Sequence, residues 1–519
     1  NENMMKYYLT TAIPYANAAP HIGTAIDYLY GDILLRYQLL RGKQAKLSIG
    51  TDEHGTKIEQ KAVASGQTPQ QLVDQLQPEF QRMRQALELN FGAPLSQIGA
   101  ELAKQDFTTQ NIVNIRTSDP LHVKRVQAIW RRLDQAGVIY KSTYQGWYCS
   151  GCEAFVTESE ARDHDFTCPG HSRPYEKLSE DNYYLAVSKF TDQLREFIRT
   201  AVVPEFRGKE LLELLKDGAQ DVSISRPADK LSWGVAVPGD PSQVMYVWID
   251  ALSNYLTVLG YPDKKWHDDY WPAQVEIVGK DILRFHAIIW PAMLLALGLP
   301  LPEKLMVHGF INVDGSKMSK SIGNVVSPLE IIDNYGVDAF RYYFTAHVPT
   351  FEDGDFSWDK FESAYNGELA NDLGNLLARV IAMIRKYFGG NLSLVSDDNE
   401  LKDQAETLLG NYKVAMDGLN LHDAVLAIME YVHELNQYIE RSAPWRVAKL
   451  EDKAERQARL DQVFSTLVNG LLLVAKYLSP FLPDTAQQLH QAVGGDSVPE
   501  TTPIIFPKKY LHSESAKHD

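Results

Sequence analysis

The stretch KYYLTTAIPYANAAPHIGT, residues 6–24, reads as a buried strand, a turn and the start of a helix. Residues 6–13 favour a strand, whereas residues 23–41 repeat apolar side chains three and four positions apart, which predicts an amphipathic helix. Gly42 is a typical helix stop, and AKLSIG at 45–50 supplies a second strand. We therefore predict a βαβ unit whose two strands are parallel neighbours.

Each strand of this unit is followed by a polar motif, PYANAAPHIGT at 14–24 and GTDEHG at 50–55. Ligands of parallel sheets bind beyond the carboxyl ends of the strands, so both motifs should face one crevice. Gly23 at a helix start lets a phosphate approach free N–H groups, and His21 can donate a hydrogen bond to charge on a bridging oxygen. This motif alone is weak, because a packed histidine explains it equally well.

Composition narrows the class of protein. At 519 residues the chain is longer than one hydrophobic core usually serves, so we expect about two to four domains. A net charge of −16 argues against a surface coated with nucleic acid but does not exclude a local basic patch.

The run LVNGLLLVAKYL at 467–478 is interrupted by Asn469 and Lys476, and the chain opens without a signal segment. We expect a cytoplasmic protein with no membrane partner.

The cysteines of the chain cluster in one segment. Cys149 and Cys152 form one knuckle, and Cys168 with His171 forms a second of the same spacing. Two such knuckles can close a tetrahedron around Zn²⁺, whereas three reduced structural thiols would not need this pairing. His164 is the rival fourth ligand, but its spacing makes no knuckle. Four protein ligands leave no open position, so we predict one structural zinc ion.

Alternating strands and helices resume after the cysteine segment, with VMYVWIDA at 244–251, AQVEIVGKD at 273–281 and KLMVHGFINV at 304–313 expected to be strands that lead into helices or turns. The cysteine segment thus reads as an insertion into one sheet domain. After about Phe361 the helical period dominates, which predicts a C-terminal helical bundle.

The segment DGSKMSKSIGN at 314–324, here called the KMSKS loop, follows the last of these strands. Lys317 and Lys320 bracket Met318 and Ser319, with Gly315 and Gly323 flanking them, so a mobile loop could bring two ammonium groups onto a polyphosphate. Two lysines alone would more simply be a solvated surface loop.

Together these motifs are specific. The His-Ile-Gly element at the first turn and the later KMSKS loop resemble the signature pair of class I aminoacyl-tRNA synthetases. Within that class, TAIPYANAAPHIG, GTDEHG, YVWIDALSNY, VGKDILRFH and the zinc knuckles resemble the methionyl-tRNA synthetases, over nearly the whole chain. The paired signatures specify the class, and the pocket segments specify methionine.

The resemblance implies an α/β Rossmann-like parallel-sheet catalytic domain with a zinc-knuckle insertion, followed by an all-α anticodon-binding bundle. The expected parts are the first catalytic half at 4–116, the connective insertion at 117–223, the second catalytic half with the KMSKS loop at 224–348, a stem at 349–365 and the bundle at 366–510.

The resemblance also implies the reaction: methionine is activated with ATP and Mg²⁺ to methionyl-adenylate and pyrophosphate, then transferred to the 3′ end of initiator and elongator methionine tRNA. The expected catalytic residues are His21, Thr24, Lys317 and Lys320. The expected ATP-binding residues are His21, Gly23, Thr24, Lys280, Asp281, Lys317 and Lys320. Positive charge and positioning must supply the rate of such a phosphoryl transfer.

The methionine site implied by the resemblance pairs a carboxylate with an apolar pocket. Asp52 would bind the ammonium group. The side chain would lie against Ile13, Tyr15, Trp248, Ala251, Leu252, Tyr255, Ile282 and His286. Aromatic walls suit a thioether, at roughly 0.3–1.5 kcal/mol per sulfur–aromatic contact, although aromatic residues at helical spacing are usually core residues.

The anticodon-reading residues implied by the resemblance are Asn375, Arg379 and Trp445. Asn375 and Arg379 are four residues apart on one helical face and could hydrogen-bond splayed bases, while Trp445 stacks on one. Such single-stranded readout needs few phosphate contacts, which reconciles it with the acidic chain.

Thr24 stands where the family often has a second histidine, so this position keeps a hydrogen-bond donor and loses an imidazole. The chain ends soon after the bundle without an appended tRNA-binding domain, which favours a monomer. Three alternatives remain: a class I synthetase for cysteine or a branched aliphatic amino acid, a non-catalytic tRNA-binding relative, and a small-molecule nucleotidyltransferase of related fold.

Overall fold

The computed structural model describes residues 5–93, 101–152, 154–263, 265–319 and 321–512. These residues fold into two compact units. The first comprises residues up to 85 together with 89–307, and the second comprises 86–88 together with the chain from 308 onward. The five-part division expected from the sequence stays a prediction.

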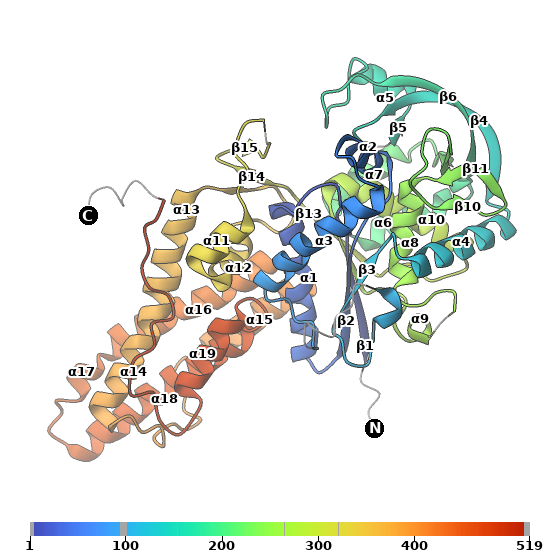
Figure 1. The fold of residues 1–519 in the computed structure, drawn as a ribbon. Helices are drawn as coiled ribbons and strands as arrows, with labels where there is room; N and C mark the ends of the chain where they lie inside the picture. The colour runs from blue at the N-terminus through green and yellow to red at the C-terminus, as the bar shows by residue number, and fades with distance from the viewer. Residues whose placement is uncertain (1–4, 94–100, 153, 264, 320, 513–519) are drawn as a thin grey trace. The chain divides into compact units, whose positions relative to one another are not determined.

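The first unit is built on a six-stranded sheet of order β3-β2-β1-β12-β13-β7 (Figure 1). Its first four strands in this order are β3 (Ile112–Arg116), which forms one edge, β2 (Gln44–Thr51), β1 (Lys6–Thr11) and β12 (Val275–Gly279), and neighbours among them pair in parallel. Leu9 on β1 aligns with Leu47 on one side and Val275 on the other. The predicted βαβ unit is confirmed, with α1 (Ile22–Leu40) as its crossover helix.

The remaining strands of this sheet are β13 (Lys304–His308) and the edge strand β7 (Val202–Val203), which pair in parallel. β7 belongs to the segment read from sequence as the insertion, so the chain returns to the main sheet before that segment ends. The helices of this part include α2 (Thr56–Ala64), α3 (Pro69–Ala86), α4 (Pro120–Gln135), α6 (Thr191–Ala201), α7 (Glu205–Leu214), α9 (Lys265–Tyr270) and α10 (Trp290–Ala296).

A long antiparallel hairpin forms the second sheet of this unit. β4 (Ile139–Cys149) pairs with β6 (Glu176–Leu185), and β5 (Ala154–Val156) and β8 (Val222–Ser223) flank them in the order β5-β4-β6-β8. Figure 1 shows β4 and β6 as a long curved ribbon, with α5 (Glu158–Asp163) near its tip. The cysteine knuckles lie at this tip, since β4 ends at Cys149.

One strand expected from the sequence is largely a helix. β11 ends at Met245, and VWIDA begins α8 (Val247–Thr257). β11 (Asp240–Met245) does not join the main sheet but forms a separate antiparallel sheet with β9 (Ser225–Pro227) and β10 (Ala236–Val237). The pattern was misleading because α8 is buried almost all around, so its apolar run lacks an amphipathic period.

The second unit joins a small sheet to a set of helices. KLMVHGFINV, expected to be one strand, is split at Gly309: its second part is β14 (Ile311–Val313), which pairs with β15 (Ser316–Lys317) and β16 (Gly354–Phe356). A Cβ on Gly309 would meet the backbone of Glu352 at 2.3 Å, so only glycine fits at this position. The shorter helices here are α11 (Pro328–Tyr335), α12 (Val337–Ala346) and α13 (Trp358–Ala364).

The predicted helical bundle is confirmed over the described residues after 361, where no extended strand occurs. Its elements are the π-helical η6 (Tyr365–Gly374), α14 (Asn375–Phe388), α15 (Lys402–Asp417), α16 (Leu421–Ser442), α17 (Pro444–Val447), α18 (Lys453–Leu478) and α19 (Pro483–Val493). Across the part of the chain that the structure describes, no helix is long and apolar enough to cross a membrane.

Candidate functional site

Two of the residues predicted to bind methionine lie side by side just beyond the ends of β1 and β2. Tyr15 and Asp52 form a parallel β-bridge beyond the regular strands. The Ala16 N–H donates to the Asp52 carbonyl at 2.8 Å, and the Asp52 N–H donates to the Pro14 carbonyl at 2.9 Å. Asp52 is 9% exposed, so its carboxylate sits in a largely dry environment where a cationic partner is strongly favoured.

The loop that carries Asp52 is held by the next residue, Glu53, which is fully buried. The Nε–H of Arg116 donates to both oxygens of the Glu53 carboxylate, at 3.0 and 2.9 Å. Three further donors bind the same carboxylate: Thr51, Gln77 and Ser118. A buried carboxylate with this many donors fixes the loop and so positions the neighbouring Asp52.

His21 is the N-cap of α1, and its ring folds back over the helix start. Its Nδ1 accepts a hydrogen bond from the Gly23 N–H at 3.0 Å, which leaves Nε2 as the protonated nitrogen of the neutral ring. A Cβ on Gly23 would lie 2.7 Å from the His21 ring. Gly23 is therefore required for this ring position.

The burial of the His21 ring favours its neutral form. Desolvation by the surrounding protein lowers its pKa below the usual value, although the residue as a whole remains exposed, and the carboxylates of Asp27 and Asp281 act in the opposite direction. Lys280 and Asp281 follow directly on β12 in a 3₁₀ turn, η4 (Lys280–Ile282). Because β12 is the parallel neighbour of β1, this turn lies at the same edge of the sheet as His21.

Thr24, expected to contact ATP, is 4% exposed in the first turn of α1. Its side chain therefore offers little surface to a ligand.

Aromatic rings cluster where α8 meets the π-helical turn η5 (Phe285–Ile289). Trp248 stacks on Phe285 with ring centroids 3.9 Å apart and planes 8° apart, and meets His286 edge-on at 6.1 Å. Tyr255 lies 5.6 Å from the His286 ring and is tied to β1 by the Tyr8 hydroxyl, which donates to its carbonyl at 2.9 Å. The structure thus brings together three of the predicted pocket residues on two elements.

His286 has a defined protonation state. Its Nδ1 donates to the Ile282 carbonyl at 2.9 Å, so its Nε2 accepts from the Tyr255 hydroxyl at 2.7 Å. Burial lowers the pKa of His286 to about 4, which keeps the ring neutral near pH 7. A neutral wall suits an uncharged thioether side chain.

The other predicted pocket residues lie on the same elements. Ala251 and Leu252 are buried on α8, one turn after Trp248, and Ile282 is partly buried against the same core. Ile13 follows β1, where a Cβ on Gly50 of β2 would come within 3.0 Å of its side chain.

The KMSKS loop belongs to the second unit. Lys317 is exposed on β15, opposite Asn312 of β14. The Asn324 side chain fastens the loop across its base, because it accepts from the Ser319 N–H at 2.8 Å and donates to the Lys317 carbonyl at 3.1 Å. Lys320 lies outside the described residues.

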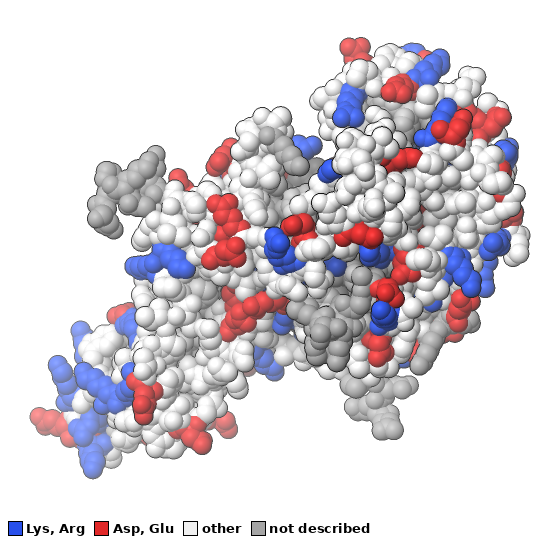
Figure 2. All heavy atoms as spheres, viewed as in Figure 1, with Lys and Arg blue, Asp and Glu red and all other residues white. Residues whose placement is uncertain are grey.

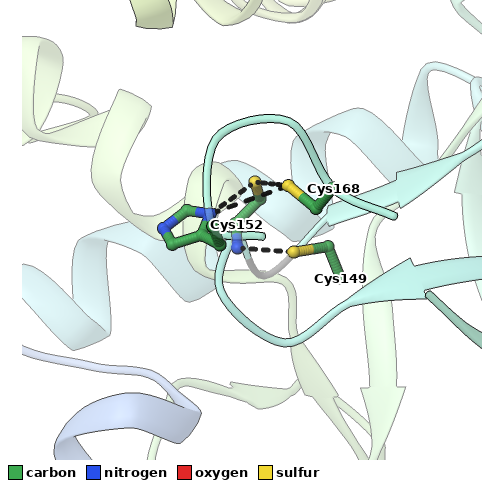
Figure 3. Close-up of side chains that lie close together, drawn as sticks. Cys149, Cys152 and Cys168 are labelled. Carbon is green, nitrogen blue, oxygen red and sulfur yellow. Dashed lines mark hydrogen bonds between the residues drawn. The ribbon is translucent and has the colours of Figure 1, made fainter. Parts of the chain in front are cut away.

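The two knuckles meet at the tip of the long hairpin (Figure 3). The ligand atoms of Cys149, Cys152, Cys168 and His171 all lie within 4.8 Å of one another. His164, the rival ligand, instead ends α5. The sulfurs of Cys152 and Cys168 are 3.5 Å apart, and His171 Nδ1 is 3.2 Å from Cys152 Sγ. This arrangement could hold a metal ion.

The knuckle depends on one glycine. A Cβ on Gly151 would lie 2.4 Å from Cγ of His171, so a larger residue would push this ring out of the cluster. Burial, together with the neighbouring sulfurs, raises the pKa of the Cys152 thiol, so a bound cation would have to displace its proton.

The predicted anticodon residues lie in the helical bundle of the second unit. Asn375 is exposed at the start of α14, where its amide donates to Asn371 at 2.9 Å. Arg379, one turn later, pairs with Glu440 of α16 at 2.7 Å. Trp445 is 36% exposed on α17.

Exposed Lys and Arg side chains gather near Trp445, interleaved with the exposed carboxylates of Glu451, Asp452 and Glu455. Figure 2 shows Lys and Arg side chains gathered at the end of the bundle, over α17 as labelled in Figure 1. The exposed cations of α17, of the turn that follows it and of the start of α18 are Arg446, Lys449, Lys453 and Arg459.

Comparisons with known proteins agree with this geometry. The family model described as "tRNA synthetases class I (M)" matches residues 7–177 and 171–381. The model described as "Anticodon binding domain of methionyl tRNA ligase" matches residues 389–503.

The chain is 39% identical over 498 residues to a methionine–tRNA ligase of Caldanaerobacter subterraneus, covering 94% of this chain and 74% of that protein. The chain belongs to the methionyl-tRNA synthetase family. A second relative, from Streptomyces coelicolor, is 40% identical over 507 residues, covering 94% of this chain and 90% of that protein. A solved structure of Mycobacterium tuberculosis methionyl-tRNA synthetase in complex with methionyl-adenylate matches with a TM-score of 0.87 at 34% identity, covering 97% of this chain and 100% of that one.

Reasoning from the sequence missed several residues of this synthetase site. Phe285, the stacking partner of Trp248, lies within VGKDILRFH but carries no helical or strand signal that predicts a π-helical turn. Glu53 and His54 follow Asp52 in GTDEHG, yet their partners are distant in sequence. Charged residues within an apolar stretch, such as Asp250 in VWIDA, were the available signal, since buried charges need partners.

Proposed function

We propose that this chain joins L-methionine to the 3′ end of initiator and elongator methionine tRNA, in two steps driven by ATP. The observation that carries this proposal is the pairing of a buried carboxylate, Asp52, with a neutral aromatic pocket at one edge of a parallel sheet, in a chain of the methionyl-tRNA synthetase family. A carboxylate in a dry setting recognises the ammonium group, while Trp248, Tyr255 and His286 recognise the side chain.

Selectivity in this pocket would come mainly from shape. A neutral His286 and a Tyr255 hydroxyl already engaged with it offer methionine an apolar wall and leave no charge to attract a polar rival. Such pockets separate substrates that differ by one methylene by only about 1–3 kcal/mol. Ile13, Tyr15, Ala251, Leu252 and Ile282 complete the proposed wall.

In the first step a methionine carboxylate oxygen attacks the α-phosphorus of ATP, and the bond to the β-phosphate oxygen breaks to release pyrophosphate. His21 would donate from Nε2 to the phosphate oxygens, while Gly23, whose N–H is engaged by Nδ1 of the same ring, would act by holding that ring in place. Lys280 and Asp281 would lie along the nucleotide. Mg²⁺ would offset phosphate charge.

We assign the charge of the departing pyrophosphate to Lys317 and Lys320. Lys317 is exposed on a short hairpin whose loop is fastened by Asn324, which suits a group that approaches a phosphate and withdraws again. We keep Thr24 as an ATP contact through its position in the first turn of α1 and not through its buried side chain.

We assign a structural Zn²⁺ to Cys149, Cys152, Cys168 and His171. Zinc–sulfur bonds of about 2.3 Å in a tetrahedron place sulfurs about 3.8 Å apart, close to the 3.5 Å between Cys152 and Cys168. Four ligands leave no open position, so the ion would hold the tip of the hairpin and take no part in the reaction.

We assign anticodon reading to Asn375, Arg379 and Trp445. Trp445 offers an exposed ring for stacking, and single exposed cations beside it would contact phosphates. Arg379 would exchange its ion pair with Glu440 for a base. The monomeric state and the cytoplasmic location stay predictions.

The test of the two-step function is the formation of methionyl-tRNA from labelled methionine, ATP and methionine tRNA. We expect acid-precipitable label that depends on all three, and release of pyrophosphate without tRNA. Pyrophosphate release without any charging would contradict the tRNA step, whereas neither product would overturn the proposal.

A further inference from the structure

A buried cluster of titratable side chains links the Asp52 loop to α8. The carboxylate of Asp250, 1% exposed, binds two imidazoles at once: Oδ2 lies 2.6 Å from His54 Nδ1, and Oδ1 lies 2.6 Å from His122 Nε2. The far nitrogen of His122 contacts the Thr257 hydroxyl at 2.7 Å. None of these four residues has been given a role in binding ATP or methionine.

The protons of this cluster can be placed. Burial disfavours an ionised Asp250, but the charges and hydrogen bonds of His54 and His122 outweigh it and hold its pKa at about 2. The carboxylate is therefore an acceptor on both sides, so the facing nitrogens of both rings carry hydrogen. The other ring nitrogen of His122 contacts the Thr257 hydroxyl, which also donates to the Asn254 carbonyl at 3.4 Å, so this end of the cluster is closed by polar partners.

The cluster occupies one face of α8, and the methionine pocket occupies another. Trp248, Ala251, Leu252 and Tyr255 recur at helical spacing and form the proposed pocket wall. Asp250 and Thr257 lie on the opposite side and are held by His54, His122 and by Arg125, which donates to the Thr257 carbonyl at 2.8 Å. These contacts fix how far α8 is rotated and how far it slides along its axis.

The other end of the cluster is the Asp52 loop. His54 stands two residues after Asp52, and its ring also packs edge-on against Trp233 at 5.0 Å. The Trp233 indole in turn donates to the Glu53 carbonyl at 2.6 Å. One buried carboxylate therefore joins the segment that carries the ammonium-binding group to the helix that carries the side-chain pocket.

We propose that Asp250 is a positioning residue for methionine, which sets the spacing between Asp52 and the pocket wall on α8 through its bonds to His54 and His122. This inference rests on the proposed function. Buried ion pairs contribute little net stability compared with apolar packing, so the role of this one is to select a single geometry. Its loss should weaken the binding of the substrate that spans both ends and spare the nucleotide.

The test is methionine-dependent exchange of pyrophosphate into ATP by the full chain carrying Asp250→Asn. Asparagine keeps the shape of aspartate but has only one acceptor oxygen, whereas each of the two imidazole N–H groups needs an acceptor. One imidazole must therefore turn or change tautomer. We expect the KM for methionine to rise about tenfold, as for the loss of about 1.4 kcal/mol of binding, while the KM for ATP changes less than about twofold. Calorimetric titration with methionine alone should give the same loss of affinity.

The matched control is Asp338→Asn in the second unit. Asp338 is also a buried aspartate, 6% exposed, whose carboxylate accepts from the Thr485 N–H at 2.6 Å and from its hydroxyl. It should leave the methionine KM unchanged, even if the melting temperature falls. If Asp250→Asn lowers the melting temperature like the control but leaves the methionine KM unchanged, the cluster is merely structural and the proposal is wrong.

A milder variant covers the case in which Asp250→Asn does not fold. Thr257→Val is nearly isosteric and removes the hydroxyl that contacts His122 Nδ1, so it should raise the methionine KM in the same direction by about two- to fivefold. An unchanged KM in this variant would also contradict the proposal. A wild-type chain without methionine-dependent exchange would instead overturn the proposed function itself.

Discussion

His21 and Gly23 form a self-contained unit at the start of α1: the Gly23 N–H donates to Nδ1 of the His21 ring, which lies where a Cβ on residue 23 would have to be. This contact selects the tautomer in which Nε2 carries the hydrogen. The glycine of the His-Ile-Gly motif is thus explained by the histidine two residues before it. The backbone conformation of Gly23 would accept alanine, but the methyl group of alanine would collide with the His21 ring.

We predict that Gly23→Ala slows methionine-dependent pyrophosphate exchange about 10- to 100-fold, because a displaced ring no longer donates to the phosphate. Methionine affinity, measured by calorimetric titration, should stay within about twofold. Gly410→Ala is the matched control, since the space around that helical glycine is open. Equal losses in the two variants, or none in Gly23→Ala, would remove His21 from its assigned role.

The burial of His286 predicts a dependence of stability on pH. The folded protein holds this ring neutral down to about pH 4, whereas the unfolded chain binds a proton below about pH 6.5. The unfolded state thus binds more protons in this window, so the free energy of unfolding falls as the pH falls from 6.5 toward 4, by up to about 3 kcal/mol.

Denaturation curves of wild type and His286→Gln at several pH values check this. The free energy of unfolding of the variant should fall less steeply over that pH range, because the variant lacks the imidazole that stays unprotonated in the folded state. Parallel pH profiles for the two proteins would show that His286 is not held neutral by the fold.

Zinc content should depend on Gly151. We predict that Gly151→Ala lowers the zinc retained after mild chelation to a fraction of the wild-type value, because the new methyl group displaces the His171 ring. Gly170→Ala is the control within the same knuckles, since its Cβ would lie 4.0 Å from Cys168 Sγ, an ordinary contact. Elemental analysis of both purified variants distinguishes them, and full zinc retention in Gly151→Ala would contradict the assignment of His171 as a ligand.

Recognition of the anticodon should be separable from activation of the amino acid. Trp445→Ala is expected to reduce kcat/KM for tRNA charging about 10- to 100-fold, the cost of one lost base stack, and to leave pyrophosphate exchange unchanged. Trp445→Phe keeps an aromatic face and should recover part of the loss. Charging and exchange that fall together would indicate damage to the fold and not to recognition.

The sequence predicts those parts of the site whose residues are close together in the chain. The βαβ unit, the shared edge of His21 and Asp52, and the cysteine knuckles were all predictable, since each follows from a period or a short spacing. The pocket residues were assigned by resemblance, because no local pattern shows that Trp248 and His286 meet.

The remainder depends on contacts between distant segments. VWIDA was expected to be a strand because a helix buried on all sides loses its amphipathic period. The stack of Phe285 on Trp248 requires a π-helical turn, and the contact of Asp250 with His54 joins residues 196 positions apart. The charge of Asp250 within an apolar run signals that it needs a buried partner, but no local pattern identifies His54 as that partner or predicts the π-helical turn.

The central claim is that methionine is the amino acid activated by this chain. Exchange of labelled pyrophosphate into ATP, measured with each of the standard amino acids in turn, tests it most directly. We predict exchange that depends on methionine and is at least about a hundredfold weaker with cysteine, leucine, isoleucine or valine. Stronger exchange with one of these would name a different synthetase, and no exchange with any amino acid would contradict the account altogether.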